Sequence, residues 1–295
     1  MFFRRKSMLI KVFTMNSFAK VQGGGNPAAI VLDANNLSDN DMQKLAEKIG
    51  FSETAFITKS ECADFKVRFF TPVEEVDLCG HATVGAFYLM AERGILTPGN
   101  YSQETRAGVL NVEVMDNHLV MMDQAIPCFY EVVDKAEIAD SLNLTIEDLE
   151  EDLLPQIVST GMRDIMVPIR SLEILNKTVP DMIKVSEMSR KYNTIGYHLF
   201  TLETLGGTAH CRNLAPLYGI PEESACGTAN GALSSYLTHH GRISIDQAKN
   251  IVMEQGYTMK MPSEILASVE MDDGEITRVR VGGKAIDIKE IEVEF

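Results

Sequence analysis

The sequence contains two similar stretches, DLCGHATVGA at residues 77–86 and SACGTANGA at residues 224–232. Each places Cys-Gly, a polar residue and Ala before a Gly-Ala pair, and each cysteine is followed fifteen residues later by a glycine, Gly94 or Gly241. The two cysteines lie 147 residues apart in a chain of 295 residues. A period near half the chain length predicts two similar domains built around corresponding elements.

The two cysteines, Cys79 and Cys226, are predicted to precede helices at about residues 83–93 and 229–239. The first N–H groups of a helix have no partner within it and lie at the positive end of its dipole. We therefore expect the pKa of each thiol to fall, and we expect the N–H groups after each cysteine, from Gly80 and Gly227, to hold a substrate carboxylate. Two thiols on opposite faces of one substrate would suit a two-base racemase or epimerase.

Other interpretations of the cysteines stay open. Cys-Gly before a helix is also compatible with a tight turn around a buried side chain, or the pair could form a redox disulfide. We interpret Cys62, Cys128 and Cys211 as structural. Five cysteines without a regular framework favour a reducing cytoplasm. The sequence has no C-x-x-C or H-E-x-x-H spacing, so we predict no metal.

Two polar residues near the N-terminus are further candidates. In SETAFI at residues 52–57, alternation places Glu53 on the apolar side of a predicted strand. A carboxylate there is costly when ionised, so its pKa is expected to rise toward the range useful for acid–base catalysis; the alternative is a solvated residue at the strand start. The turn GGGNP at residues 23–27 leads into a strand, unlike a phosphate loop, and leaves Asn26 as a candidate substrate ligand.

Charge and hydropathy narrow the class of protein. With 42 acidic and 27 basic residues, the net charge is −15, which argues against binding nucleic acid or an anionic membrane. No apolar run approaches the ~20 residues that span a bilayer. Lys11 interrupts the apolar segment after Met8, so no signal peptide is expected, and Met8 is an alternative start to Met1. We expect a cytoplasmic protein with a small anionic or zwitterionic substrate.

Hydrophobic periodicity predicts the domain organisation. Ser38 is expected to cap a helix that ends at Gly50, and a second helix is predicted over residues 145–154. Most other segments alternate as strands do. We predict a first domain over residues 1–124 and a second over residues 125–295, with the last strand free to return to the first domain.

These motifs together resemble the phenazine-biosynthesis isomerase (PhzF-like) family of the diaminopimelate-epimerase-like superfamily. The resemblance implies an α+β fold of two similar half-barrel domains, each a curved, mostly antiparallel sheet around a central helix. It also implies a pseudo-two-fold axis with the site in the cleft between the halves, no metal or cofactor, and a homodimer. The motifs occur in order along the chain: GNPAA at residues 25–29, SETAF at 52–56, FTP at 70–72, GHATVG at 80–85, EESACGTANG at 222–231 and EQG at 254–256.

The resemblance also assigns roles to particular residues. Glu53 matches the catalytic acid/base of the family and His81 matches its supporting histidine. Glu223 stands where the family usually has Asp, and Thr228 where Ser is common. Cys226 stands where the family usually has Thr, so that with Cys79 the chain has a thiol pair similar to that of proline racemases and diaminopimelate epimerases.

Three hypotheses follow. In the first, Glu53 moves a proton between two carbons on one face of an unsaturated acid and so shifts a double bond. In the second, Cys79 and Cys226 invert an amino-acid α-carbon from opposite faces. In the third, the chain only binds a small ligand. Arg163 and Arg212 are candidates for contacting a carboxylate, or form ion pairs instead.

Overall fold

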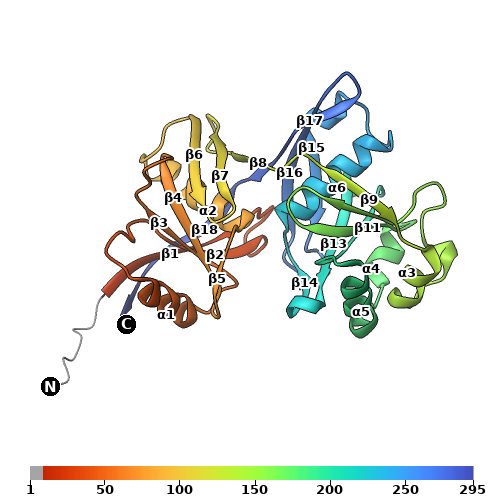
Figure 1. The fold of residues 1–295 in the computed structure, drawn as a ribbon, viewed down its shortest axis with the longest axis horizontal. Helices are drawn as coiled ribbons and strands as arrows, with labels where there is room; N and C mark the ends of the chain where they lie inside the picture. Colours follow the sequence, from red (N-terminus) through yellow and green to blue (C-terminus); the bar gives the residue numbers. More distant parts are fainter. Residues whose placement is uncertain (1–8, 295) are drawn as a thin grey trace. The chain divides into compact units, whose positions relative to one another are not determined.

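The computed structural model describes residues 9–294, so the alternative starts at Met1 and Met8 lie outside the described residues. The chain divides into two compact units (Figure 1). Unit 1 consists of Met1–Ser17, described from residue 9, with Pro27–Met122 and with Lys284–Phe295, described to residue 294. Unit 2 consists of Phe18–Asn26 and Asp123–Gly283.

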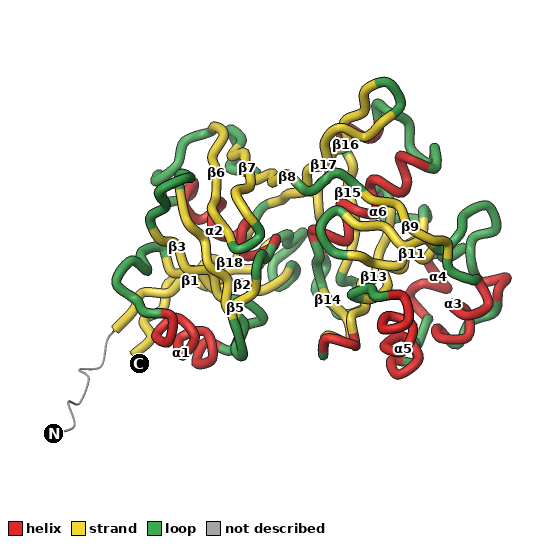
Figure 2. The backbone as a smooth tube through the Cα atoms, in the orientation of Figure 1, coloured by secondary structure: helices red, strands yellow, loops and turns green. Residues whose placement is uncertain are grey.

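Unit 1 is a mixed sheet with an outer helix and a central helix (Figure 2). The helices are α1 (Asp39–Ile49) and α2 (Gly80–Glu92). The strands are β1 (Leu9–Ser17), β2 (Asn26–Val31), β3 (Thr54–Thr58), β4 (Phe65–Phe70), β5 (Glu75–Val76), β6 (Gly99–Thr105), β7 (Gly108–Val114), β8 (Val120–Asp123), which ends at the boundary, and β18 (Ala285–Glu294).

Unit 2 has the same general plan with more helices on its outer side. The helices are α3 (Lys135–Leu142), α4 (Leu172–Lys177), α5 (Met182–Tyr192) and α6 (Gly227–His239), with 3-10 turns at Ile146–Asp148, Pro216–Tyr218 and Gln247–Lys249. The strands are β9 (Cys128–Val132), β10 (Gln156–Ser159), β11 (Arg163–Pro168), β12 (Gly196–Thr201), β13 (Ala209–Ala215), β14 (Ile220–Glu223), β15 (Ile251–Gln255), β16 (Ser263–Asp272) and β17 (Glu275–Gly283).

The strand pairings repeat from one unit to the other. In unit 1, β2 is parallel to β3, β3 antiparallel to β4, β4 parallel to β6, and β6 antiparallel to β7. In unit 2, β11 is parallel to β12, β12 antiparallel to β13, β13 parallel to β15, and β15 antiparallel to β16. This repetition confirms the predicted α+β fold of two similar domains.

The central helices α2 and α6 match each other in detail. Each has 13 residues and begins directly after its cysteine, which has an extended backbone. Each is followed by a left-handed glycine, Gly94 with φ of 68° and Gly241 with φ of 65°. Both helices begin earlier than the predicted starts at residues 83 and 229. Glycine disfavours helix, but packing among strands keeps the first turns helical although each begins with a glycine.

Small residues let strands pack closely around these helices. The helix α2 packs on β1, β3, β7 and β18, and α6 packs on β10, β11, β16 and β17. A Cβ at Gly85 would lie 2.8 Å from Ser17 Oγ, and one at Gly231 would lie 3.1 Å from Val281 Cγ1. The glycine of each Gly-Ala pair therefore lies where a strand residue packs closely against the helix.

The predicted boundaries of α1 are correct. Ser38 and Asp41 form a reciprocal capping box, and Gly50 ends the helix with φ of 73°. The buried face of α1, including Met42 and Leu45, packs on β2, β3 and β4 in one apolar cluster.

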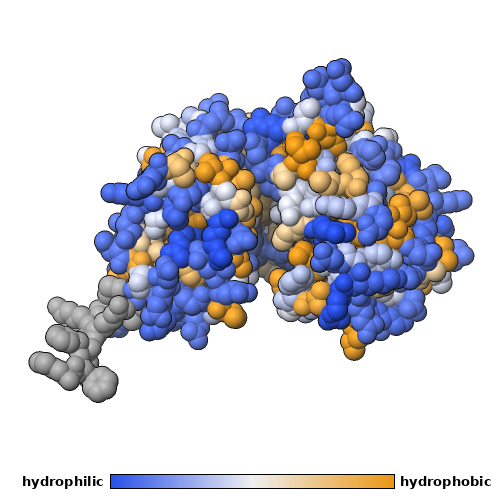
Figure 3. Space-filling view, viewed as in Figure 1, coloured by the Kyte–Doolittle hydropathy of each residue, from blue (hydrophilic) through white to orange (hydrophobic). Residues whose placement is uncertain are grey.

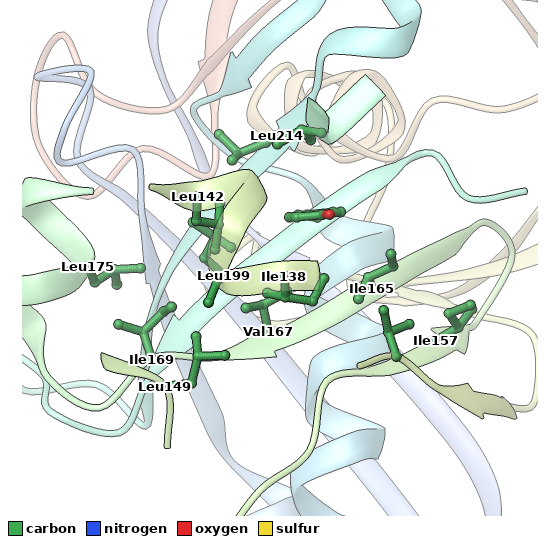
Figure 4. Packing of buried hydrophobic residues seen from close by; sticks show 14 residues of the cluster. Ile138, Leu142, Leu149, Ile157, Ile165, Val167, Ile169, Leu175, Leu199 and Leu214 are labelled. Atoms are coloured by element: carbon green, nitrogen blue, oxygen red, sulfur yellow. The ribbon is translucent and has the colours of Figure 1, made fainter. Parts of the chain in front are cut away.

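The helix predicted over residues 145–154 is wrong. Only a 3-10 turn forms there, at Ile146–Asp148, and the α-helix lies earlier, where Asp134 caps α3 and Asn143 ends it with φ of 55°. Leu149 bridges to Ile169 as extended chain and enters the core cluster of unit 2 with Ile138 (Figure 4). Apolar spacing alone did not distinguish these two ways of burying leucines.

The chain crosses between the units more often than predicted. Residues 18–26 were assigned to the first domain but pack in unit 2. Lys20 N–H donates to Pro262 O at 3.1 Å, and Phe18 O accepts from Glu264 N at 2.7 Å. The last strand, β18, pairs with β1 in unit 1, and the crossing between Met122 and Asp123 lies close to the predicted boundary at residues 124 and 125.

The exposed surface is largely polar. The face seen in Figure 3 is mainly hydrophilic, with apolar residues interspersed. In the part of the chain that the structure describes, every helix is too short or too polar to cross a bilayer.

Candidate active site

Three of the predicted residues converge in unit 1. Glu53 directly precedes β3, where its carbonyl accepts from Ala29 N–H, Cys79 caps α2, and His81 lies in the first turn of that helix. The distance from His81 Nε2 to Glu53 Oε2 is 3.2 Å. Cys79 Sγ lies 3.4 Å from Nδ1 and 3.7 Å from Nε2 of His81. The fold thus joins two motifs that are separate in the sequence.

Glu53 and His81 form a charged pair. Burial favours neutral Glu53, but the hydrogen bond and charge of His81 outweigh it and hold the pKa of the carboxyl below its usual value. Burial likewise opposes the imidazolium, but Cys79 and Glu53 raise the pKa of His81 well above its usual value. The predicted rise in the pKa of Glu53 is therefore wrong, because alternation did not reveal its cationic partner.

The predicted fall in the pKa of both cysteines is also wrong. Burial, followed by the charge of Glu53, raises the pKa of Cys79. Burial and the acids around Cys226 raise the pKa of its thiol well above the usual value, although Ala229 N–H at the start of α6 acts in the opposite direction. Desolvation outweighs the helix start in both places, so both side chains are thiols at neutral pH.

Unit 2 brings together a second set of predicted residues. Glu223 ends β14, and Cys226 caps α6, whose first residues are Gly227 and Thr228. Asn26 Nδ2 donates to Glu223 Oε1 at 2.9 Å and to Ala225 O at 3.0 Å. Asn26 is buried and ties the glycine-rich turn to the segment before α6.

Asp164 on β11 was not predicted from the sequence. It is only 1% exposed, and its Oδ1 has no hydrogen-bond partner among the described residues. Burial, and then the negative charge of Glu223, raise the pKa of Asp164 to about 8. Asp164 is the single acid in the apolar strand RDIMVP, and the same kind of pattern made Glu53 a candidate. The sequence therefore contained a signal that could have identified Asp164.

A buried amide network supports the segment before α6. Asn213 Nδ2 donates to His198 Nδ1 at 3.3 Å, and His198 Nε2 contacts Asn230 Oδ1 at 3.2 Å. Asn230 Nδ2 donates to Cys226 O at 2.8 Å and to Gln255 Oε1 at 2.6 Å, and Gln255 Nε2 donates to Glu223 O at 2.8 Å.

Burial lowers the pKa of His198 to about 4, so this histidine is neutral, accepting at Nδ1 and donating at Nε2. The chain of hydrogen bonds that starts at His198 therefore fixes the backbone of both Glu223 and Cys226.

The two candidate arginines have structural roles. Arg212 pairs with both oxygens of Glu222, at 3.0 and 2.9 Å, and donates to two backbone carbonyls. Arg163 lies 3.7 Å from Glu131 and its guanidinium stands over the Tyr130 ring at 4.2 Å. All five cysteines lie in the described part of the chain and are free.

Sequence comparison identifies related proteins along most of the chain. A family model described as phenazine biosynthesis-like protein (PhzC-PhzF) matches residues 15–290. The uncharacterized isomerase YfhB of Bacillus subtilis is 36% identical over 94% of this chain and 96% of its own length. Trans-2,3-dihydro-3-hydroxyanthranilate isomerase of Pseudomonas chlororaphis is 29% identical over 92% of this chain and 95% of its own length.

A solved structure shows the same architecture. The PhzF-family phenazine biosynthesis protein of Bacillus anthracis matches with a TM-score of 0.87 and 32% sequence identity. The match covers 97% of this chain and 99% of that chain. The similarity therefore includes both units and both central helices.

Proposed function

The chain belongs to the phenazine biosynthesis-like (PhzC-PhzF) family and is an isomerase, and we propose that it moves a proton on a small carboxylic or amino acid without a cofactor, with Glu53 as the proton carrier. The observation that carries the proposal is the Glu53–His81 pair beside the start of α2. A relative is named for isomerising trans-2,3-dihydro-3-hydroxyanthranilate, an acid of this class. The predicted cleft between the halves and the homodimer stay predictions.

The charge state of the pair suits a base. Because His81 lowers the pKa of Glu53, the carboxylate is already formed at neutral pH and needs no further activation. Its side chain is 19% exposed, while that of His81 is 5% exposed, so Glu53 presents the accessible edge of the pair. His81 acts through Glu53 and is a positioning residue.

In the proposed reaction, the Glu53 carboxylate breaks a C–H bond of the substrate by taking the proton. The electron pair shifts the adjacent double bond, and the protonated Glu53 then forms a new C–H bond at another carbon on the same face. Backbone N–H groups at the start of α2, beginning with Gly80, would hold a substrate carboxylate. No electrons are gained or lost, and the enzyme returns to its initial state.

Other groups at the start of α6 would bind the substrate rather than carry the proton. Gly227 and Thr228 open α6 and offer the same kind of helix start. Glu223, held by Asn26, would contact a substrate amine, and a zwitterionic or anionic small molecule fits this combination of groups. Five free cysteines support the further proposal of a cytoplasmic location.

Exchange of solvent deuterium into substrate tests the proposal. Trans-2,3-dihydro-3-hydroxyanthranilate and a panel of free amino acids are incubated with enzyme in deuterated water, and incorporation is followed by mass spectrometry. Glu53→Gln is expected to lower turnover by roughly 10²–10⁴-fold, the usual contribution of a general base. Cys226→Ser is expected to lower it by less than about ten-fold, because that thiol is not the base.

Glu47→Gln is the matched control, since it makes the same chemical change at an exposed position on α1. Retained turnover in Glu53→Gln together with loss in both Cys79→Ser and Cys226→Ser would reject Glu53 and favour the two-thiol racemase. The raised pKa of both thiols argues against that alternative.

A further inference from the structure

Asp164 is an acid in the interior of unit 2 that faces α6. On β11, Ile165 and Val167 enter the core cluster that packs on α3, α4 and α5, so alternation turns Asp164 to the opposite side of the sheet. Its partners in the sheet are Val158 on β10 and Gly196 on β12. Neither has a polar side chain, which agrees with the lack of a hydrogen-bond partner for Asp164 Oδ1 among the described residues.

A row of polar side chains on this face connects Asp164 to the start of α6. Asn213 pairs with His198 in one neighbouring strand and with Glu223 in the other, and directly paired side chains lie on the same face. His198 hydrogen-bonds to α6, so these side chains share the face of Asp164. The charges of Asp164 and Glu223 both act on the thiol of Cys226, which places the two acids beside the first turn of the helix.

One of these two acids keeps its proton at neutral pH. Burial and the charge of Glu223 raise the pKa of Asp164 to about 8, and the N–H of Gly196 acts less strongly in the opposite direction. Arg163, the preceding residue, does not offset the burial, because it points to the other face and stands over the Tyr130 ring.

The other titratable side chains on this face carry no charge at neutral pH. Burial lowers the pKa of His198 on β12 to about 4 and raises the pKa of Cys211 on β13 and of Cys226 well above the usual value. The strand β10 contributes no titratable residue. A positive group bound at Glu223 would therefore act first on Asp164, whose pKa lies nearest to neutrality.

We propose that Asp164 is a positioning residue of the substrate site, which holds a proton while the site is empty and releases it when a cationic amine binds at Glu223. The inference rests on the proposed contact between Glu223 and a substrate amine, and it narrows the substrate to an acid that also carries a basic amine. On binding, the O–H bond of Asp164 breaks, its electron pair stays on the carboxylate and the proton passes to the buffer. The ammonium charge then favours both carboxylates, which repel each other in its absence.

Proton release on binding is the direct test. Trans-2,3-dihydro-3-hydroxyanthranilate and the panel of free amino acids are titrated into Glu53→Gln, in which turnover should be slow, by calorimetry at neutral pH in phosphate and in Tris. The difference in heat between the two buffers gives the number of protons released. We expect roughly 0.5–0.9 protons per bound amine, because Asp164 is mostly protonated in the empty site and mostly ionised in the occupied one. Infrared spectroscopy should show the loss of a protonated carboxyl band on binding.

Two variants isolate Asp164. In the same background, Asp164→Asn should release almost no protons, whereas Asp116→Asn, the same change at an exposed position, should leave the release unchanged. With Glu53 present, the KM of the enzyme should fall by roughly ten-fold from about pH 6.5 to about pH 8, and the KM of Asp164→Asn should stay level. A purely structural role would not produce this pH dependence of KM. Circular dichroism verifies that Asp164→Asn is folded.

The inference and the proposed function fail separately. The role of Asp164 is overturned if amine binding releases no proton, if Asp164→Asn releases as many protons as the protein that keeps Asp164, or if none of the amines binds. Full turnover in Glu53→Gln would instead reject Glu53 as the proton carrier. That result would leave a proton release that depends on Asp164 intact.

Discussion

The starts of α2 and α6 share their backbone but differ in their charges. In both, a cysteine caps a helix of 13 residues, and the side chain four residues later, Thr83 or Asn230, donates to the cysteine carbonyl at 2.9 or 2.8 Å. That side chain in turn contacts a buried glutamine of a neighbouring strand, Gln103 or Gln255.

The surroundings then diverge. Beside α2 one acid, Glu53, is paired with His81. Beside α6 two acids, Asp164 and Glu223, lie near the thiol of Cys226, and the hydrogen-bond network there consists of neutral amides and a neutral histidine. A duplicated helix start therefore does not fix the protonation state of the acid beside it: Glu53 is ionised at neutral pH, whereas the pKa of Asp164 is raised to about 8 by its surroundings.

The largest expected effect is on the pH dependence of the free energy of unfolding, and it comes from Asp164. Its pKa is about 8 in the folded protein, against a reference value of 3.8, so between these values the unfolded chain has released a proton that the folded protein keeps. The contribution of Asp164 to stability should thus fall as pH rises through this window, by roughly 1.4 kcal/mol per pH unit, and level off above it. Because His198 and His81 also contribute to the pH dependence, the measured quantity is the difference between two slopes: in urea denaturation at about pH 5.5, 6.5 and 7.5, stability should fall more steeply with pH in wild type than in Asp164→Asn by that amount.

The exposed residue Asp116 provides the control for that measurement. Asp116→Asn should keep the wild-type slope. Equal slopes in wild type and Asp164→Asn would mean that Asp164 is ionised throughout, and the contrast between the two helix starts would lose its main support.

His81 should produce the next largest effect, on the acid beside it. Without the imidazolium, the main group that opposes the effect of burial on Glu53 is lost, so His81→Asn should raise the pKa of Glu53. The carboxylate would then be lost at a higher pH than in wild type. Titration of ¹³C-labelled glutamate side chains by NMR measures this shift without a substrate.

Thr228→Val changes the residue at the matching offset after Cys226 and should leave the Glu53 titration where it is. A titration of Glu53 that is the same in His81→Asn and wild type would contradict the charged pair.

Replacing each of the two buried glutamines should lower stability by different amounts, and this difference is expected to be smaller than the effects above. Gln255→Leu removes the acceptor of Asn230 and the donor to Glu223 O, and it leaves buried amide groups unpaired at about 1–3 kcal/mol. Gln103→Leu should cost less, because Thr83 keeps its bond to Cys79 O. Chemical denaturation at one pH measures the loss of stability in both variants. A larger loss in Gln103→Leu than in Gln255→Leu would contradict the prediction that the hydrogen-bond network beside α6 is the more extensive one.

The smallest effect tests what the helices share. Gly94 and Gly241 have φ of 68° and 65°, and a Cβ at either would contact nothing within 4 Å. Each Gly→Ala variant should therefore lose only the cost of a left-handed alanine, about 1 kcal/mol, and the two losses should be equal. Thermal unfolding of the pair checks this, and clearly unequal losses would show that the two helix ends are not equivalent.

Local patterns were sufficient for much of the fold. The repeated Cys-Gly motif predicted two similar domains, and Ser38 and Gly50 predicted both ends of α1, because capping depends on residues a few positions apart. The helix expected over residues 145–154 failed because its leucines are buried by strands that are distant in sequence. The assignment of residues 18–26 failed for the same kind of reason.

The sequence by itself determined which side chains are available: Glu53, His81 and the two cysteines, each in a motif with a local signature. Only the tertiary structure decided their chemistry, since it placed His81 3.2 Å from Glu53 and Asp164 near Glu223 and Cys226. The pKa of a buried group depends on desolvation and on charges a few ångströms away. Those neighbours come from other strands, so no spacing along the chain reveals them.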